Sequence, residues 1–303
     1  MTDPERLLDE LRPVCFAIAY RMLGSVTEAE DVVQEALFRV HQALAGGEQI
    51  VSPRAFATTV TTRLAINELR SARVRRERYV GEWLPEPILT DLRDDPAWQA
   101  EMADSLSLAM LVLLESLSPE QRAVLLLHDV FDYSYPEVSS IVGKSENNVR
   151  QLASRARHHV EQRRPRFQTT REQREELAAR FFAASEQGDL AGLEALLAHD
   201  VELVADGGGK APAREGPLRG RTQVAQSVIE YARRRAALIP DVQIRRAEVN
   251  GMPGALYLDA RDELILVVAL EIAGGQITGI NSILNPDKLA HLGPTADLSS
   301  FLP

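Results

Sequence analysis

Residues 117–157 constrain the fold of this chain more than any other segment, because they read as two helices, a tight turn and a third helix. The turn is Gly143-Lys144-Ser145. Glycine accepts the left-handed backbone that ends one helix, and the Ser145 hydroxyl can cap the next. This order of elements predicts a helix-turn-helix, a motif that places its last helix in the major groove of duplex DNA.

The last helix of this segment, predicted over residues 146–160, is amphipathic. Its apolar residues recur on one face at Val149, Leu152, Ala153, Ala156 and Val160. The opposite face carries side chains that can bond base edges or phosphates, namely Asn147, Arg150, Gln151, Ser154, Arg155 and Arg157. An ordinary amphipathic helix alternates in the same way, so the turn and the cationic tail Arg163-Arg164-Pro165-Arg166 are what favour DNA.

The distribution of charge matters more than its sum. The formal net charge is −10, which is unusual for a protein that binds nucleic acid alone. Residues 63–78 nevertheless hold six arginines against two acids, and residues 145–166 again hold six arginines against two acids. Two basic segments in an acidic chain predict weak binding to free DNA and a partner that delivers the protein to it.

The sequence gives no sign of export. No apolar run approaches the roughly 20 residues of a membrane span. The first residues, Met1-Thr-Asp-Pro-Glu-Arg6, are polar and acidic where a signal peptide is basic and then apolar. The single cysteine, Cys15, cannot form an intrachain disulfide. We therefore expect a cytoplasmic protein with no membrane segment.

The pattern predicts a multidomain protein with two all-α domains followed by an α+β domain. Residues 1–80 form the first helical domain, in which Thr27 is expected to cap a helix that begins at Glu28. Residues 81–96 form a linker whose prolines favour extended backbone, and residues 97–167 form the second helical domain. Residues 168–303 begin with helices and continue with strand-like runs at 242–249, 255–260, 264–272 and 276–284. These runs predict an antiparallel sheet with helices on one face.

Several segments together resemble a known family. Residues 19–25, 28–35, 53–56 and 67–70 (Ala-Tyr-Arg-Met-Leu-Gly-Ser, Glu-Ala-Glu-Asp-Val-Val-Gln-Glu, Pro-Arg-Ala-Phe and Asn-Glu-Leu-Arg) resemble region 2 of bacterial extracytoplasmic-function RNA polymerase sigma factors. The helix-turn-helix resembles their region 4. Residues 79–87 (Tyr-Val-Gly-Glu-Trp-Leu-Pro-Glu-Pro), 206–210 (Asp-Gly-Gly-Gly-Lys) and 285–289 (Asn-Pro-Asp-Lys-Leu) resemble the subgroup with a fused C-terminal SnoaL-like domain, an NTF2-like cone.

The resemblance implies a non-enzymatic factor, without a cofactor, that binds core RNA polymerase at the β′ clamp and β flap and recognises promoter DNA. The implied polymerase-binding residues are Asp31, Gln34, Glu35 and Phe38. The residues implied to read the −10 element are Arg63, Asn67, Arg70 and Arg73, although the arginines of 73–78 are also compatible with a simple phosphate-holding patch. The residues implied at the −35 element are Asn147, Asn148, Arg150, Gln151, Ser154, Arg155 and Arg157.

The resemblance also implies that the C-terminal domain regulates the helical domains in cis. The implied regulatory residues are Trp83, Leu84, Pro85, Glu86 and Pro87 in the linker and Asp206, Gly207, Gly208, Gly209, Lys210, Asn285, Pro286, Asp287, Lys288 and Leu289 in the C-terminal domain. The apolar Trp83 and Leu84 need a surface to pack on, whereas we interpret the glycine run as a mobile loop. A small ligand in the cavity of this domain stays open as an input. The alternative is a small-molecule sensor or enzyme that the helical part only targets to DNA.

Overall fold

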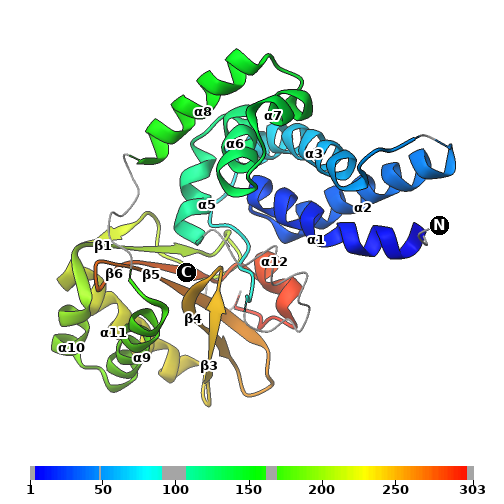
Figure 1. Ribbon diagram of the computed structural model, residues 1–303. Coiled ribbons are helices and arrows are strands. Elements are labelled where there is room, and N and C mark those ends of the chain that lie inside the picture. Colours follow the sequence, from blue (N-terminus) through cyan, green and yellow to red (C-terminus); the bar gives the residue numbers. More distant parts are fainter. Residues whose placement is uncertain (1–3, 48, 91–106, 162–168, 299–303) are drawn as a thin grey trace. The chain divides into compact units, whose positions relative to one another are not determined.

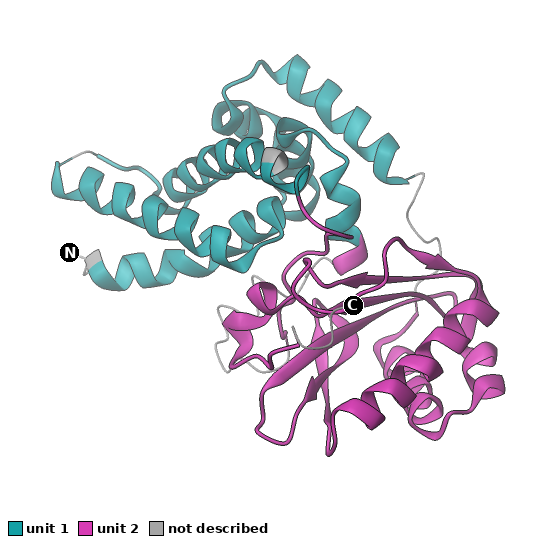
Figure 2. Cartoon of the chain, turned by 180° about the vertical axis from the view of Figure 1, so that it is seen from behind, with its two compact units in different colours: residues 1–78, 93–105, 110–164 teal, residues 79–92, 106–109, 165–303 magenta. Residues whose placement is uncertain are grey.

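The computed structural model describes residues 4–47, 49–90, 107–161 and 169–298, without the side chains of residues 4, 73 and 74. The chain forms two compact units (Figure 2). The first comprises Met1–Arg78, Arg93–Ser105 and Met110–Arg164, and the second comprises Tyr79–Leu92, Leu106–Ala109 and Pro165–Pro303. The linker residues 79–90 thus pack as part of the second unit, although they lie between the two helical segments in the sequence. Within the described ranges, no helix has the length and apolar character needed to cross a membrane.

Three long helices begin the first unit, namely α1 (Pro4–Leu23), α2 (Val26–Ala45) and α3 (Pro53–Arg76) (Figure 1). Gly24 has a positive φ of 68° and ends α1. The cap of α2 is Ser25, whose hydroxyl accepts the Glu28 N–H at 3.1 Å. The expected cap at Thr27 is wrong because Ser25 already has the extended backbone of a cap residue, and α2 begins directly after it.

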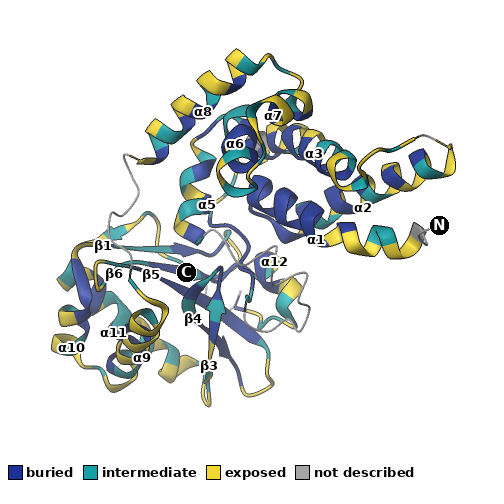
Figure 3. Cartoon of the chain, viewed as in Figure 1, coloured by how far each residue is buried: buried dark blue, intermediate teal, exposed yellow. Residues whose placement is uncertain are grey.

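The predicted helix-turn-helix is confirmed within the same unit. The helices of this segment are α5 (Leu108–Glu115), whose first two residues belong to the second unit, α6 (Pro119–Leu125), a π-helical turn η1 (Leu126–Val130), α7 (Tyr135–Val142) and α8 (Glu146–Glu161). Gly143 follows α7 with a left-handed φ of 66°, and Ser145 accepts the Asn148 N–H at 3.4 Å. The apolar stripe of α8 is buried (Figure 3). Leu152 is the exception, because it is only partly buried.

The second unit is α+β, as predicted. Its helices and strands, in chain order, are α9 (Arg171–Gln187), α10 (Leu190–Leu196), β1 (Leu197–Asp206), β2 (Leu218–Arg219), α11 (Arg221–Leu238), β3 (Gln243–Val249), β4 (Met252–Leu258), β5 (Leu264–Ala273), β6 (Gln276–Ile283), α12 (Pro286–Leu289) and the 3₁₀ turn η2 (Ala290–Leu292). The strands form one sheet in the order β2-β1-β6-β5-β4-β3. All neighbours are antiparallel except β1 and β6, which pair in parallel, so the expectation of a purely antiparallel sheet is wrong at that pair.

Both faces of the sheet are covered, which explains the nearly continuous burial of β5. Leu266, Val268 and Leu270 belong to the core that includes residues of α9, α10 and α11. The alternate residues Val267 and Ala269 belong to a second core, which includes Leu84 of the linker and Leu289 of α12. The helices α9, α10 and α11 therefore cover one face, as predicted, and the linker and α12 help to cover the other.

Candidate functional sites

Helix α2 has one buried and one exposed face. Asp31, Gln34, Glu35 and Phe38, which the sequence predicts to bind a partner, all lie on the exposed face. The Phe38 ring is 54% exposed although it is a large apolar group, and Glu35 forms a 2.7 Å ion pair with Arg39. Because single exposed apolar residues are common, the exposure of Phe38 does not by itself mark an interface.

Helix α3 carries the residues predicted to meet the −10 element. Arg63, Asn67 and Arg70 are exposed on one face of the helix. Arg73 also lies in α3, and its side chain is outside the described part of the structure. Arg63, Asn67 and Arg70 are spaced by four and three residues, which places them on one side of α3.

Two of these arginines are engaged within the first unit by the helix-turn-helix. Arg63 donates from Nε to the Ile141 carbonyl at 2.8 Å and from a terminal nitrogen to the Ser140 carbonyl at 3.0 Å, at the end of α7. Arg70 forms a 2.6 Å ion pair with Glu120 of α6. Burial is the largest single influence on Glu120 and would raise its pKa. The hydrogen bond from Arg70, a backbone hydrogen bond and the charges of Arg70 and Lys144 together outweigh burial, so the pKa lies below its ordinary value. We call the contacts of Arg63 with the end of α7 and of Arg70 with α6 the α3–α7 interlock.

A buried arginine holds the same two helical segments together. Arg122 of α6 is fully buried and donates from Nε to the carbonyl of Arg21 in α1 at 3.0 Å. It also pairs with Glu115, which receives Arg76 of α3 as well. Burial lowers the pKa of Arg122, and the neighbouring carboxylate opposes this shift. The sequence analysis missed Arg122, because nothing local distinguishes it from a solvated arginine.

Helix α8 exposes most of the side chains predicted at the −35 element. Asn147, Asn148, Arg150, Gln151, Ser154 and Arg155 are all exposed. Arg150 lies 4.3 Å from the ring centre of Tyr135 and pairs with Glu146 at 2.6 Å. Arg157 differs from them, because its Nε donates to Asp129 at 2.8 Å and a terminal nitrogen donates to the Tyr135 hydroxyl at 3.2 Å. In the structure Arg157 ties α8 to the preceding elements, whereas Arg155 has no ion pair among the described residues.

The linker docks on the second unit around one buried ion pair. The Asp206 side chain, at the end of β1, is 0% exposed and that of Lys288, in α12, is 8% exposed. Lys288 Nζ lies 2.6 Å from Asp206 Oδ2, which also accepts the Leu84 N–H at 2.8 Å. Lys288 donates in addition to the Leu84 carbonyl. The backbone of Leu84 is thus bonded by both members of the pair.

Aromatic residues complete this cluster. The Tyr79 hydroxyl donates to Asp206 Oδ1 at 2.5 Å and accepts the Asn285 amide N–H at 2.8 Å. The Lys288 ammonium lies 4.6 Å from the Tyr79 ring centre and 4.3 Å from the Trp83 ring centre. Burial, followed by the hydrogen bond to Asp206, raises the pKa of Tyr79 and keeps its phenol neutral. We call Tyr79, Leu84, Asp206, Asn285 and Lys288 the Asp206 cluster.

The rest of the linker is also held. Residues 84–88 are buried, which confirms that Leu84 finds a surface to pack on. Ile88 and Asn250 exchange hydrogen bonds through Ile88 N to Asn250 Oδ1 at 3.0 Å and Asn250 N to Ile88 O at 2.9 Å. Thr90 bonds Glu248, and Leu89 forms a β-bridge with Val249. The sequence analysis did not assign Tyr79, Glu248 or Asn250 to a site, since their partners are far away in the sequence.

The glycine run is not the mobile loop that the sequence suggests. Gly208 has a φ of 57° and packs so closely that a Cβ would overlap the Asn285 amide and lie 2.8 Å from the Tyr79 hydroxyl. Lys210 forms a 2.7 Å ion pair with Asp287 on the surface. Glycine is needed here for close approach as well as for its backbone angles. Among the described residues, no group of His, Cys, Asp and Glu could hold a metal ion.

Gly208→Ala is therefore expected to destabilise the second unit by about 2–4 kcal/mol, because strained backbone and steric overlap act together. Gly216→Ala is the matched control, since Gly216 has a similar φ of 71° but open space around it. That control is expected to lose only about 1 kcal/mol. Urea denaturation of both variants measures the difference, and equal losses would show that the close approach to Asn285 and Tyr79 is unimportant.

Comparison with known proteins places these sites in context. Residues 7–75 match the family model "Sigma-70 region 2", and residues 107–160 match "Sigma-70, region 4". The chain is 36% identical over 289 residues to "ECF RNA polymerase sigma factor SigJ" of Mycobacterium tuberculosis, covering 92% of this chain and 91% of that protein. It is 31% identical over 278 residues to "Probable ECF RNA polymerase sigma factor SigI" of the same species, covering 91% of both chains. The crystal structure of M. tuberculosis SigJ superposes with a TM-score of 0.77 at 33% identity, covering 97% of this chain and 100% of that one.

Proposed function

Because the chain belongs to the extracytoplasmic-function RNA polymerase sigma factors, whose partners are core polymerase and promoter DNA, we propose specific roles for its surfaces in transcription initiation. The exposed face of α2 binds the β′ clamp of the polymerase. Helix α3 reads the −10 element through Arg63, Asn67, Arg70 and Arg73. The exposed face of α8 reads the −35 element, with this second helical segment also contacting the β flap. The protein acts in the cytoplasm with the polymerase.

We further propose that the second unit, residues 168–303 together with the docked linker, regulates the sigma regions in cis. The observation that supports this role is the Asp206 cluster, which bonds the backbone of Leu84, a residue that lies between the two sigma regions in the sequence. A change in the second unit is thereby transmitted to the segment that joins the two promoter-reading parts. The boundaries 1–80, 81–96, 97–167 and 168–303 remain our proposal for the functional segments.

Run-off transcription with core polymerase and a library of promoter fragments tests the proposed role of α2. Asp31→Arg is expected to lower core binding and transcript yield at least tenfold, because a reversed charge faces a complementary partner surface. Asp9→Arg is the matched control, since Asp9 is an exposed acid on α1, outside the proposed face. It should behave as the unaltered protein does. Full activity of Asp31→Arg would show that this face is not the clamp-binding surface.

Arg155→Ala and Arg157→Ala are expected to separate DNA contact from folding. Arg155→Ala should weaken promoter binding by the holoenzyme and reduce the slope of log affinity against log salt by about one, without changing stability. Arg157→Ala should lower the free energy of unfolding by about 1–2 kcal/mol, because Asp129 and Tyr135 lose their partner. Fluorescence anisotropy over a salt series and thermal unfolding measure the two effects. If Arg155→Ala lowered stability and Arg157→Ala weakened promoter binding instead, the two roles would have been assigned the wrong way round.

A further inference from the structure

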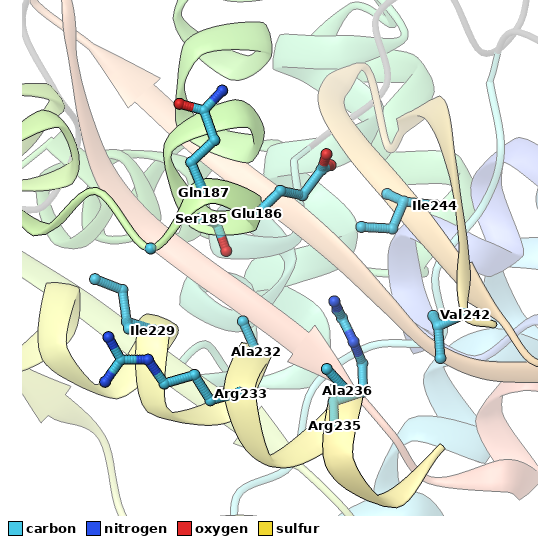
Figure 4. Close-up of a pocket in the computed structure, with 11 residues that line it drawn as sticks. Ser185, Glu186, Gln187, Ile229, Ala232, Arg233, Arg235, Ala236, Val242 and Ile244 are labelled. Atoms are coloured by element: carbon cyan, nitrogen blue, oxygen red, sulfur yellow. The ribbon is translucent and has the colours of Figure 1, made fainter. Parts of the chain in front are cut away.

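The second unit contains a cavity of about 570 Å³ that lies away from the Asp206 cluster. Figure 4 shows its lining, which comes from the end of α9, from α11 and from β3. The volume lies within the range of about 300–1,000 Å³ that is typical of small-molecule sites. It is large enough for a compact organic ligand.

One wall of the cavity is apolar. Ile229 is buried, while Val242 and Ile244 are partly buried and pack against the main core of the unit. Ala232 and Ala236 of α11 add small side chains that leave the space open. This wall suits the hydrocarbon part of a ligand, because burying apolar area contributes about 25 cal/mol per Å².

The polar lining is mainly cationic. Arg235 extends from α11 towards the space beside Val242, and Arg233 extends from the same helix beside Ile229 (Figure 4). The Arg235 guanidinium lies 4.6 Å from the Tyr257 ring centre, and its Nε atom is buried without a hydrogen-bond partner among the described residues. Arg235 as a whole is only partly buried and lines the cavity, so the other N–H groups of its guanidinium can donate to a ligand oxygen.

The acidic group of the lining does not cancel this charge. Glu186 lies 3.5 Å from Arg246, which itself stacks 3.7 Å above the Phe182 ring. Around the cavity, three arginines (Arg233, Arg235 and Arg246) are therefore balanced by a single carboxylate, that of Glu186. In a chain with a formal net charge of −10, such a local excess of positive charge favours an anion.

We propose that this cavity binds a small organic carboxylate with an apolar body. Its carboxylate pairs with the Arg235 guanidinium, and its hydrocarbon part lies on Ile229, Val242 and Ile244. Guanidinium and carboxylate groups match in planar geometry and form charge-assisted hydrogen bonds. That binding regulates transcription rests on the regulatory role proposed above for the second unit. Binding itself does not depend on that role, because it involves neither polymerase nor DNA.

Isothermal titration calorimetry on the full chain tests the proposal with probes that share one body and differ in their head group. Octanoate is compared with octanol and octylamine, and 1-naphthoate with naphthalene-1-methanol. Saturable binding is expected for at least one carboxylate, at least tenfold tighter than its neutral or cationic counterpart. Equal binding of all head groups, or no binding of either carboxylate, would overturn the proposal.

Variants then locate the site. Arg235→Gln is expected to weaken carboxylate binding at least tenfold. Arg234→Gln is the matched control, because Arg234 is on the same helix, is exposed and pairs with Glu230 instead of lining the cavity. Its affinity should stay within twofold. Ala232→Phe fills the cavity without changing its charge and should abolish binding, which keeps the test valid even if Arg235→Gln folds poorly. Unchanged affinity in Ala232→Phe would place the bound carboxylate elsewhere and overturn the proposal. That outcome would not count against the sigma role, which the transcription assay tests separately.

Discussion

Asp206→Ala is expected to lower the free energy of unfolding of the second unit by about 3–5 kcal/mol and to release the linker from the sheet. Lys288 would stay buried without its anion, and removing one partner of a buried pair leaves an uncompensated charge. The Tyr79 hydroxyl and the Leu84 N–H would lose their acceptor in the same step. Urea denaturation measures the stability, and hydrogen exchange at the amides of Leu84 and Ile88 measures the release.

Two further variants sharpen this test. Asp287→Ala breaks the Lys210 ion pair, whose side chains are 55% and 63% exposed, and should change stability by no more than about 1 kcal/mol. Adding Lys288→Met to Asp206→Ala should recover part of the loss, because it removes the unpaired buried charge. If Asp206→Ala and Asp287→Ala were equally destabilising, or if the linker amides stayed protected, the cluster would not be what holds the linker.

The first unit is expected to open when it engages a promoter. Elements centred near −10 and −35 are separated by about 25 base pairs, or roughly 85 Å at about 3.4 Å per base pair. In the α3–α7 interlock, however, Arg63 of α3 lies 2.8 Å from the carbonyl of Ile141, just before the helix-turn-helix turn. The two proposed readers cannot reach both elements in this arrangement. Opening also frees Arg63 and Arg70, whose donors are otherwise occupied.

Energy transfer between two dyes measures this opening. Labels at Glu10→Cys on α1 and Glu161→Cys at the end of α8 should show a large fall in transfer when core polymerase and promoter are added. The native Cys15 is fully buried and should react slowly with the dyes. Labels at Glu10→Cys and Glu77→Cys, both in the segment Met1–Arg78 of the first unit, provide the matched control and should show little change. Unchanged transfer in the first pair would mean that the interlock persists in the initiation complex.

Local patterns were sufficient to predict the order of two helical regions followed by an α+β domain. The turn at Gly143 and the buried stripe of α8 were predictable because backbone angles and helical periodicity are properties of neighbouring residues. The need of Leu84 for a surface was predictable from its apolar side chain in an extended, proline-containing segment. Each of these features depends only on a few residues that are close together in the sequence, which is why it could be predicted.

Features that depend on distant partners were not predictable. Asp206 and Lys288 are 82 positions apart, and neither residue alone indicates a buried ion pair. The glycines that follow Asp206 suggest a flexible backbone, and only the positions of Asn285 and Tyr79 show why Gly208 is needed. Arg155 and Arg157 look equivalent in the sequence, yet Asp129 and Tyr135 engage only the second. The parallel pairing of β1 with β6 likewise follows from the fold as a whole.

The two units are interlaced along the chain, so no single cut separates them. A protein that ends near residue 167 would keep residues 79–90 but lose the sheet on which they lie. Leu84 and Ile88, which are 1% and 4% exposed in the whole protein, would then be exposed to water in an extended segment that is prone to aggregate. If such a deletion lost activity, the loss of regulation and the aggregation of the protein could not be told apart as its cause. A cleaner dissection replaces the buried side of the linker with polar residues at the same time, or inserts a protease site after residue 167 and retains both pieces.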